Sequence, residues 1–186
     1  MGSINQVNES RRLLQHFLAA LAYRTQKALR DAPADFSEFN AGNKVRTPHE
    51  LVWHMTGLMG YARTYFHGGV FGPAEAPRLH SFRAEVERFH SVLTLLSRDF
   101  GNLTLEARIT DQQFLQGPLA DAMTHAGQLA MLRRLHGQPV PSENFIYATI
   151  STDNLGSAQP APAAPDPEWT PQLGHQPPGP SKSPPS

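Results

Sequence analysis

Apolar residues recur at helical spacing in four stretches of the chain, which cover about residues 8–30, 47–67, 81–100 and 117–136. This spacing places the apolar side chains of each stretch on one face of an α-helix. Helices with a single apolar face are stable when they pack against one another. The pattern therefore predicts an all-α fold, a four-helix bundle with long loops between the helices.

The second stretch has a well-defined beginning. Thr47 is a favourable N-cap, Pro48 suits the first helical position, and Glu50 stands at the third position after the cap, which together form a capping box. One face of the helix that follows carries Leu51, His54, Leu58 and Tyr61. The pattern therefore predicts that His54 points inward among apolar neighbours.

The fourth stretch begins at Gly117 and Pro118 and carries Asp121 and His125 one helical turn apart. Both fall on the same face as its apolar residues, so we expect both to point inward. A buried ionised carboxylate needs a partner to offset its desolvation cost. A hydrogen-bonded Asp–His pair would provide one, and so would a metal ion.

Two regions lack helical periodicity. Apolar and polar residues alternate over part of residues 102–117, which suggests a short extended segment. From about Gly156 the chain is dominated by Pro, Ala, Ser and Gly, and ten of its seventeen prolines lie between Pro160 and Pro185. Such a composition cannot bury enough apolar surface to fold. We predict a bundle domain over residues 1–155 and a disordered tail over residues 156–186.

Charge and composition narrow the function. The chain has 16 basic and 16 acidic residues, and this balance argues against nucleic-acid and anionic-membrane partners, which favour a basic excess. It has no cysteine, which excludes a disulfide framework and a thiol nucleophile. The N-terminus lacks a signal-peptide pattern, and no apolar run is long enough for a membrane span. We expect a cytoplasmic protein.

His54, Asp121 and His125 are the candidate metal ligands. Two imidazoles and one carboxylate can hold a divalent ion from one side and leave other coordination positions open. The ligand types are compatible with Zn, Ni, Fe or Mn and do not choose among them. The prediction requires that two distant stretches of the chain meet in space.

The segment from Gly117 to Arg134, followed by Pro-Ser-Glu-Asn-Phe at residues 141–145, resembles the DinB/YfiT-like superfamily of four-helix metalloproteins, as does the helix around His54. The resemblance covers about residues 8–150. It implies one divalent metal held by a histidine of the second helix and by two ligands one turn apart on a later helix. Many members have His-x-x-x-His at that position, whereas this chain has a carboxylate at Asp121.

Four further residues are candidates for the surroundings of the metal. Gln128 follows His125 by three positions and could bond a ligand, and Glu143 could fold over an open site. Trp53 and Tyr61 could line an apolar wall of a pocket. Each also has an ordinary explanation: Gln128 on the surface, Glu143 in a turn, and the two aromatic residues in the core.

The resemblance implies a metal-dependent enzyme acting on a small molecule, by transfer of a low-molecular-weight thiol or by hydrolysis, and homodimers are common among the similar proteins. The sequence identifies no catalytic residue. The alternative is a non-catalytic, stress-associated bundle that binds a metal or another ligand.

Overall fold

A computed structural model describes residues 2–68, 76–102 and 109–166 of the protein. This part of the chain is helical and contains no β-strand, only one isolated bridge between Glu143 and Pro165. The four long helices are α1 (Gly2–Leu29), α2 (Pro48–Thr64), α3 (Phe82–Asn102) and α5 (Ala120–Leu135). The predicted four-helix bundle is confirmed.

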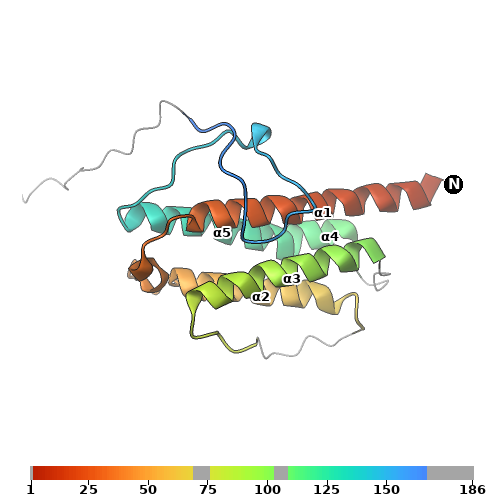
Figure 1. The fold of residues 1–186 in the computed structure, drawn as a ribbon. Coiled ribbons are helices and arrows are strands. Elements are labelled where there is room, and N and C mark those ends of the chain that lie inside the picture. Colours follow the sequence, from red (N-terminus) through yellow and green to blue (C-terminus); the bar gives the residue numbers. More distant parts are fainter. Residues whose placement is uncertain (1, 69–75, 103–108, 167–186) are drawn as a thin grey trace, which may run out of the picture.

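Each long helix packs against two others (Figure 1). The helices α1 and α2 lie across the bundle from each other, and each contacts both α3 and α5. In Figure 1, α2 and α3 run in one direction while α1 and α5 run in the other. This arrangement places the long axis of α2 antiparallel to α5, so that the start of α5 faces the middle of α2.

Apolar side chains from all four long helices fill the bundle, and Phe89, Leu93 and Leu96 of α3 are completely buried. Each buried Leu or Phe side chain stabilises the fold by roughly 1.5–3 kcal/mol. An aromatic cluster of Phe66, Phe100 and Phe114 closes one end. The bundle therefore has one continuous apolar core, and packing in this core holds α2 and α5 at a fixed separation.

The predicted start of α2 is also confirmed. The Thr47 side chain accepts a hydrogen bond from the Glu50 backbone N–H, and the Glu50 carboxylate accepts one from the Thr47 backbone N–H. Just before α2, the short 3₁₀ helix η1 (Ala34–Glu38) inserts Phe36 into the core, where its ring meets that of His136. The buried face of the helix that follows includes Leu51, Val52 and Met55, and His54 lies beside this face at intermediate exposure.

The segment before α5 differs from the sequence-based expectation. Helical turns begin at residue 111, in the one-turn helix α4 (Asp111–Phe114) and the π-helical turn η2 (Leu115–Leu119), and the backbone is kinked at Gly117, where φ is −92° and ψ is −109°. A second capping box, formed by Thr110 and Gln113, begins α4. The fourth helical stretch therefore begins before the predicted Gly117, and residues 103–108, which carry most of the alternation that suggested an extended segment, lie outside the described residues.

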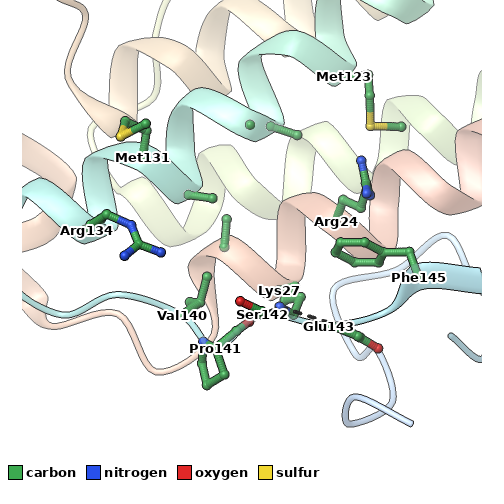
Figure 2. A pocket seen from close by; sticks show the side chains of 14 residues that line it. Arg24, Lys27, Met123, Met131, Arg134, Val140, Pro141, Ser142, Glu143 and Phe145 are labelled. Atoms are coloured by element: carbon green, nitrogen blue, oxygen red, sulfur yellow. Dashed lines mark hydrogen bonds and ion pairs between the residues drawn. The ribbon is translucent and has the colours of Figure 1, made fainter. Parts of the chain in front are cut away.

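The chain after α5 folds back along α1 (Figure 1). Tyr23 of α1 donates a hydrogen bond of 2.7 Å to Oε1 of Glu143, and the Nζ atom of Lys27 lies 3.8 Å from Oε2 of the same carboxylate. The Lys27 ammonium also donates to the Pro141 carbonyl. Figure 2 shows Lys27 and Glu143 side by side. Burial lowers the pKa of Lys27, and the Glu143 carboxylate partly offsets that effect.

The returning segment continues across the bundle beyond Leu155, which is buried. The Leu155 carbonyl lies 2.8 Å from Nδ1 of His90 on α3, and Arg30 donates to the carbonyls of Gln159 and Pro160. Residues 156–166, which the composition assigns to the tail, thus contact the bundle. The rest of the predicted tail, residues 167–186, lies outside the described residues.

None of the helices in the described ranges combines the length and apolar character that crossing a lipid bilayer requires.

Candidate metal centre

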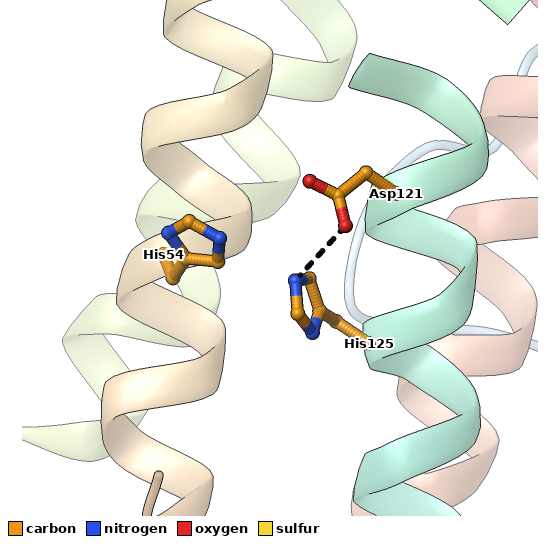
Figure 3. Close-up of side chains that lie close together, drawn as sticks. All are labelled: His54, Asp121 and His125. Carbon is orange, nitrogen blue, oxygen red and sulfur yellow. Dashed lines mark ion pairs between the residues drawn. The ribbon is translucent and has the colours of Figure 1, made fainter. Parts of the chain in front are cut away.

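Three side chains with metal-binding atoms converge between α2 and α5. His54 extends from the middle of α2, and Asp121 and His125 extend from the first two turns of α5 toward it (Figure 3). One ligand atom from each residue can be chosen so that all three atoms lie within 4.8 Å of one another. The described part of the chain contains no other group of three such residues that could hold a metal ion. The two distant stretches of sequence therefore meet as predicted.

The two ligands on α5 are already close. Nε2 of His125 lies 3.2 Å from Oδ1 of Asp121, which is possible because the two residues are one helical turn apart. The imidazole rings of His54 and His125 meet edge to face, with centroids 4.9 Å apart and an interplanar angle of 77°. The ring of His54 therefore faces the pair from the opposite helix.

These distances can be compared with what a metal ion requires. Bonds from Zn²⁺ to histidine nitrogen or carboxylate oxygen are about 2.0–2.2 Å long, so two ligands of one tetrahedral ion lie no more than about 3.6 Å apart. The separation of Asp121 and His125 satisfies this limit already. A ligand pair separated by the full 4.8 Å would have to close by about 1 Å, through rotation of the side chains, before both atoms could bind one ion. His54, Asp121 and His125 could hold a metal ion.

Gln128 determines how His125 can act as a ligand. Its Oε1 atom lies 2.9 Å from Nδ1 of His125, one turn further along α5. An N–H on Nδ1 that donates to this oxygen leaves the lone pair on Nε2, where it faces Asp121 and His54. In this arrangement Nδ1 faces the Gln128 oxygen and Nε2 faces the Asp121 oxygen. A proton or a metal ion between Nε2 and the Asp121 carboxylate would make the second of these contacts favourable.

The exposure of the site differs from the prediction. The His125 side chain is 9 % exposed, as expected for an inward-facing residue, but the Asp121 side chain is 49 % exposed. The expectation that Asp121 points into the core is therefore wrong, because the buried face at the beginning of α5 is formed by Ala122, His125 and Ala126, and Asp121 lies beside that face. Burial alone does not require a cation beside this carboxylate. The case for a metal rests on the convergence of three ligands instead.

Glu143 makes its contacts elsewhere. Its carboxylate is fully buried against Tyr23 and Lys27 of α1, and it lines a cavity of about 400 Å³ on the side of α5 that also presents Met123 and Gly127 (Figure 2). The prediction that Glu143 folds over the metal site finds no support in these contacts. The position of Glu143 depends on the path of the chain after α5, and no local sequence pattern predicts that path.

The two aromatic candidates on α2 have partners of their own. The Trp53 indole N–H donates a hydrogen bond of 2.8 Å to the Ala76 carbonyl, which lies between α2 and α3 in the chain. The hydroxyl groups of Tyr61 and Tyr65 form a hydrogen bond with each other. Tyr61 lies about two helical turns from His54 along α2. A role for either aromatic residue beside a bound metal stays a prediction.

An open cavity of about 700 Å³ adjoins the site and includes His125 and Gln128 in its wall. Its other side is the loop before α2, which contributes Lys44 and Arg46. Pockets of roughly 300–1,000 Å³ are of the size that holds a small molecule. Neither basic residue belongs to a recognisable sequence motif. The sequence therefore did not predict that this loop lies beside α5.

Comparisons of the chain with models of protein families, with curated proteins and with solved structures found no match.

Proposed function

We propose that this protein binds one divalent metal ion through His54, Asp121 and His125 and uses it to act on a small molecule. The observation that carries the proposal is the convergence of the three ligand atoms from two helices within 4.8 Å of one another. The resemblance of the segment from Gly117 to Arg134 to the DinB/YfiT-like superfamily supports the same ligand set.

The ligand types are compatible with Zn, Ni, Fe or Mn and do not choose among them. Two neutral imidazoles and one carboxylate leave a divalent ion with a net charge of about +1 and with coordination positions open to other molecules. When bound, such an ion supplies either an acidified water for hydrolysis or a coordinated thiolate for transfer of a low-molecular-weight thiol. The exposed carboxylate of Asp121 leaves the site accessible from solvent, which either reaction needs.

A second reading is a protein that binds a metal or small ligand without catalysing a reaction. The contact that favours it is the one between His125 and Gln128, because an amide holds the imidazole in place but cannot take up a proton. The choice between the two functions depends on whether metal-loaded protein turns over a substrate.

Metal analysis tests the site itself. Full-length protein purified without a metal-chelating column should contain about one metal ion per chain, and His125→Ala should lose it. The matched control is His80→Ala, because His80 is exposed and lies outside the three-residue site. Equal metal content in His125→Ala and the wild type, with both variants folded by circular dichroism, would contradict the proposal.

Activity assays test the second step. Thiol-conjugation and ester substrates should be screened with the metal-loaded protein, the metal-free protein and Asp121→Ala. Turnover that requires both the metal and Asp121 would establish an enzyme. Stoichiometric metal without turnover of either substrate class would favour the non-catalytic alternative.

A further inference from the structure

The wall of the cavity beside the metal site combines basic side chains from the loop before α2 with apolar side chains from that loop and from α5. Lys44 and Arg46 line it from the loop before α2, and none of the described residues in its wall is acidic. Both basic side chains are exposed, and no ion pair in the described part of the chain involves either of them. The nearest acidic residue in sequence, Glu50, is directed at the Thr47 backbone N–H instead. The cavity therefore offers positive charge that the protein does not neutralise.

The apolar wall is unusually open to solvent. Val45 is 46 % exposed, Met131 is 56 % exposed and Leu135 is 58 % exposed, and all three line this one cavity. Large apolar side chains that gather at an open cavity are typical of a surface that a ligand covers. His125 and Leu135 mark the ends of the α5 wall, about 15 Å apart along the helix.

The loop that carries the basic residues has a defined shape. The backbone φ angles of Gly42, Asn43 and Lys44 are 80°, 51° and 61°, so three consecutive residues adopt the left-handed conformation. Asn40 accepts a hydrogen bond from the Gly42 N–H, and the Val45 N–H donates to the Gly42 carbonyl. A left-handed conformation costs Lys44 of order 1–3 kcal/mol, and such cost is often found at functional sites. The loop thereby holds Lys44 at the cavity.

We propose that this cavity selects an organic anion as the small molecule of the metal site. Its anionic group lies against Lys44 and Arg46, its apolar chain covers Met131 and Leu135, and its reactive end reaches the metal beside His125. The inference rests on the proposed function, because the metal holds one end of the ligand. A carboxylate, phosphate or sulfonate would pair with the two basic side chains equally well.

Synthetic probes can separate the two ends. Alkyl hydroxamates bind many divalent metals through their head group, and they can be made in increasing chain length with either a carboxylate or a hydroxyl group at the far end. Binding of each pair to zinc-loaded full-length protein should be measured by calorimetry. At the length that spans the cavity, the carboxylate probe should bind about 3–10-fold more tightly than its hydroxyl counterpart, the range expected for exposed ion pairs.

The variants identify the source of the preference. The double variant Lys44→Gln, Arg46→Gln should bind the two probes equally and should bind the hydroxyl probe as the wild type does. Arg12→Gln, an exposed basic residue of α1 outside the cavity, is the matched control and should keep the preference. The preference should also weaken as salt is raised. Phosphonate and sulfonate probes of the same length then rank the anionic groups.

Three outcomes decide the matter. A carboxylate preference that vanishes only in the double variant supports the proposal. Equal binding of both probes at every length, or a preference that survives in the double variant, overturns the anion site and leaves the metal site intact. Absence of hydroxamate binding, together with absence of retained zinc, overturns the metal site and this inference with it.

Discussion

The Nδ1 atom of His125 lies 2.9 Å from Oε1 of Gln128, one turn further along α5. This hydrogen bond orients the imidazole so that Nε2 faces Asp121 and His54. Metal-binding histidines commonly donate their second N–H to an oxygen in this way, which fixes the ring and strengthens the ligand. The relationship gives Gln128 a defined role that its exposed position on the helix does not suggest.

Removing the amide of Gln128 should weaken metal binding without abolishing it. Gln128→Ala should lower the affinity for Zn²⁺ by about 10–100-fold, because His125 loses the oxygen that orients it. Gln128→Glu should restore much of the affinity, since a carboxylate accepts the same hydrogen bond. Competition titrations against a chromophoric chelator measure both.

The matched control for Gln128 is Thr124→Ala. Thr124 is exposed on α5 and its hydroxyl donates to the Ala120 carbonyl of its own helix. An affinity of Gln128→Ala equal to that of Thr124→Ala would show that the hydrogen bond does not support the metal.

Asp121→Asn should separate metal binding from stability. The substitution removes the negative ligand, so the Zn²⁺ affinity should fall at least tenfold. The carboxylate is half exposed, so the free energy of unfolding of the metal-free protein should change by less than about 0.5 kcal/mol. Chelator competition and urea unfolding in the presence of EDTA provide the two values. A large loss of stability without metal would indicate that Asp121 is a structural residue.

Tyr23→Phe should destabilise the fold through Glu143. The phenol is the donor to the buried Oε1 atom of Glu143, and a hydrogen bond to a charged group contributes about 1.5–3 kcal/mol. Urea denaturation should show a loss of this size. Tyr147→Phe, in which the same hydroxyl is removed from an exposed ring, should leave stability within about 0.5 kcal/mol of the wild type.

The same tyrosine should titrate late. Burial, together with the hydrogen bond to Glu143, raises the pKa of Tyr23 from its usual 10.0 to about 12. Because the folded pKa is above the unfolded one, the stability from this group is complete below about pH 10 and is lost as the pH rises through about 12. Absorbance of the phenolate should show a late-titrating tyrosine in the wild type that is missing in Tyr23→Phe.

His90 should make the protein less stable in mild acid. Burial lowers the pKa of His90 below its usual 6.5, despite the opposing effect of the Leu155 carbonyl. The unfolded chain then binds a proton more readily than the folded one. The contribution of His90 to the free energy of unfolding is therefore complete above about pH 6.5 and is lost as the pH falls toward the folded pKa. Urea unfolding of His90→Asn should show a weaker dependence on pH between about 7.5 and 5.5.

A second substitution separates the effect of His90 from the general effect of removing a histidine. His80→Asn is the control, because His80 is exposed. A slope in His90→Asn equal to that of His80→Asn would mean that the proton-linked loss arises elsewhere.

Local chemistry was enough to predict most of the fold. The capping box of Thr47 and Glu50 identified the first residue of α2, and apolar periodicity identified the four long helices. The start of α4 was missed although Thr110 and Gln113 have the same spacing as that first capping box. The signal was present in the sequence, but the alternating apolar residues just before it suggested an extended segment.

The site was predictable only in part. One-turn spacing places Asp121 and His125 together in any helix, but their distance from His54 depends on how α2 and α5 pack. The exposure of Asp121 and the position of Glu143 depend on tertiary contacts alone. Lys44 and Arg46, the basic residues of the cavity, belong to a loop before α2. No local sequence pattern predicts that this loop packs beside α5.

The division of the three ligands between α2 and α5 links the metal to the order of events in folding. A nascent chain that has completed α2 still lacks two of the three ligands, and it acquires them only when α5 is made and docks. A bound ion would then link α2 and α5, two helices that are far apart in the sequence, through coordination bonds at His54, Asp121 and His125. Removal of the ion by a chelator would remove the stabilisation that its binding gives to the folded state, so the free energy of unfolding would depend on the concentration of free metal.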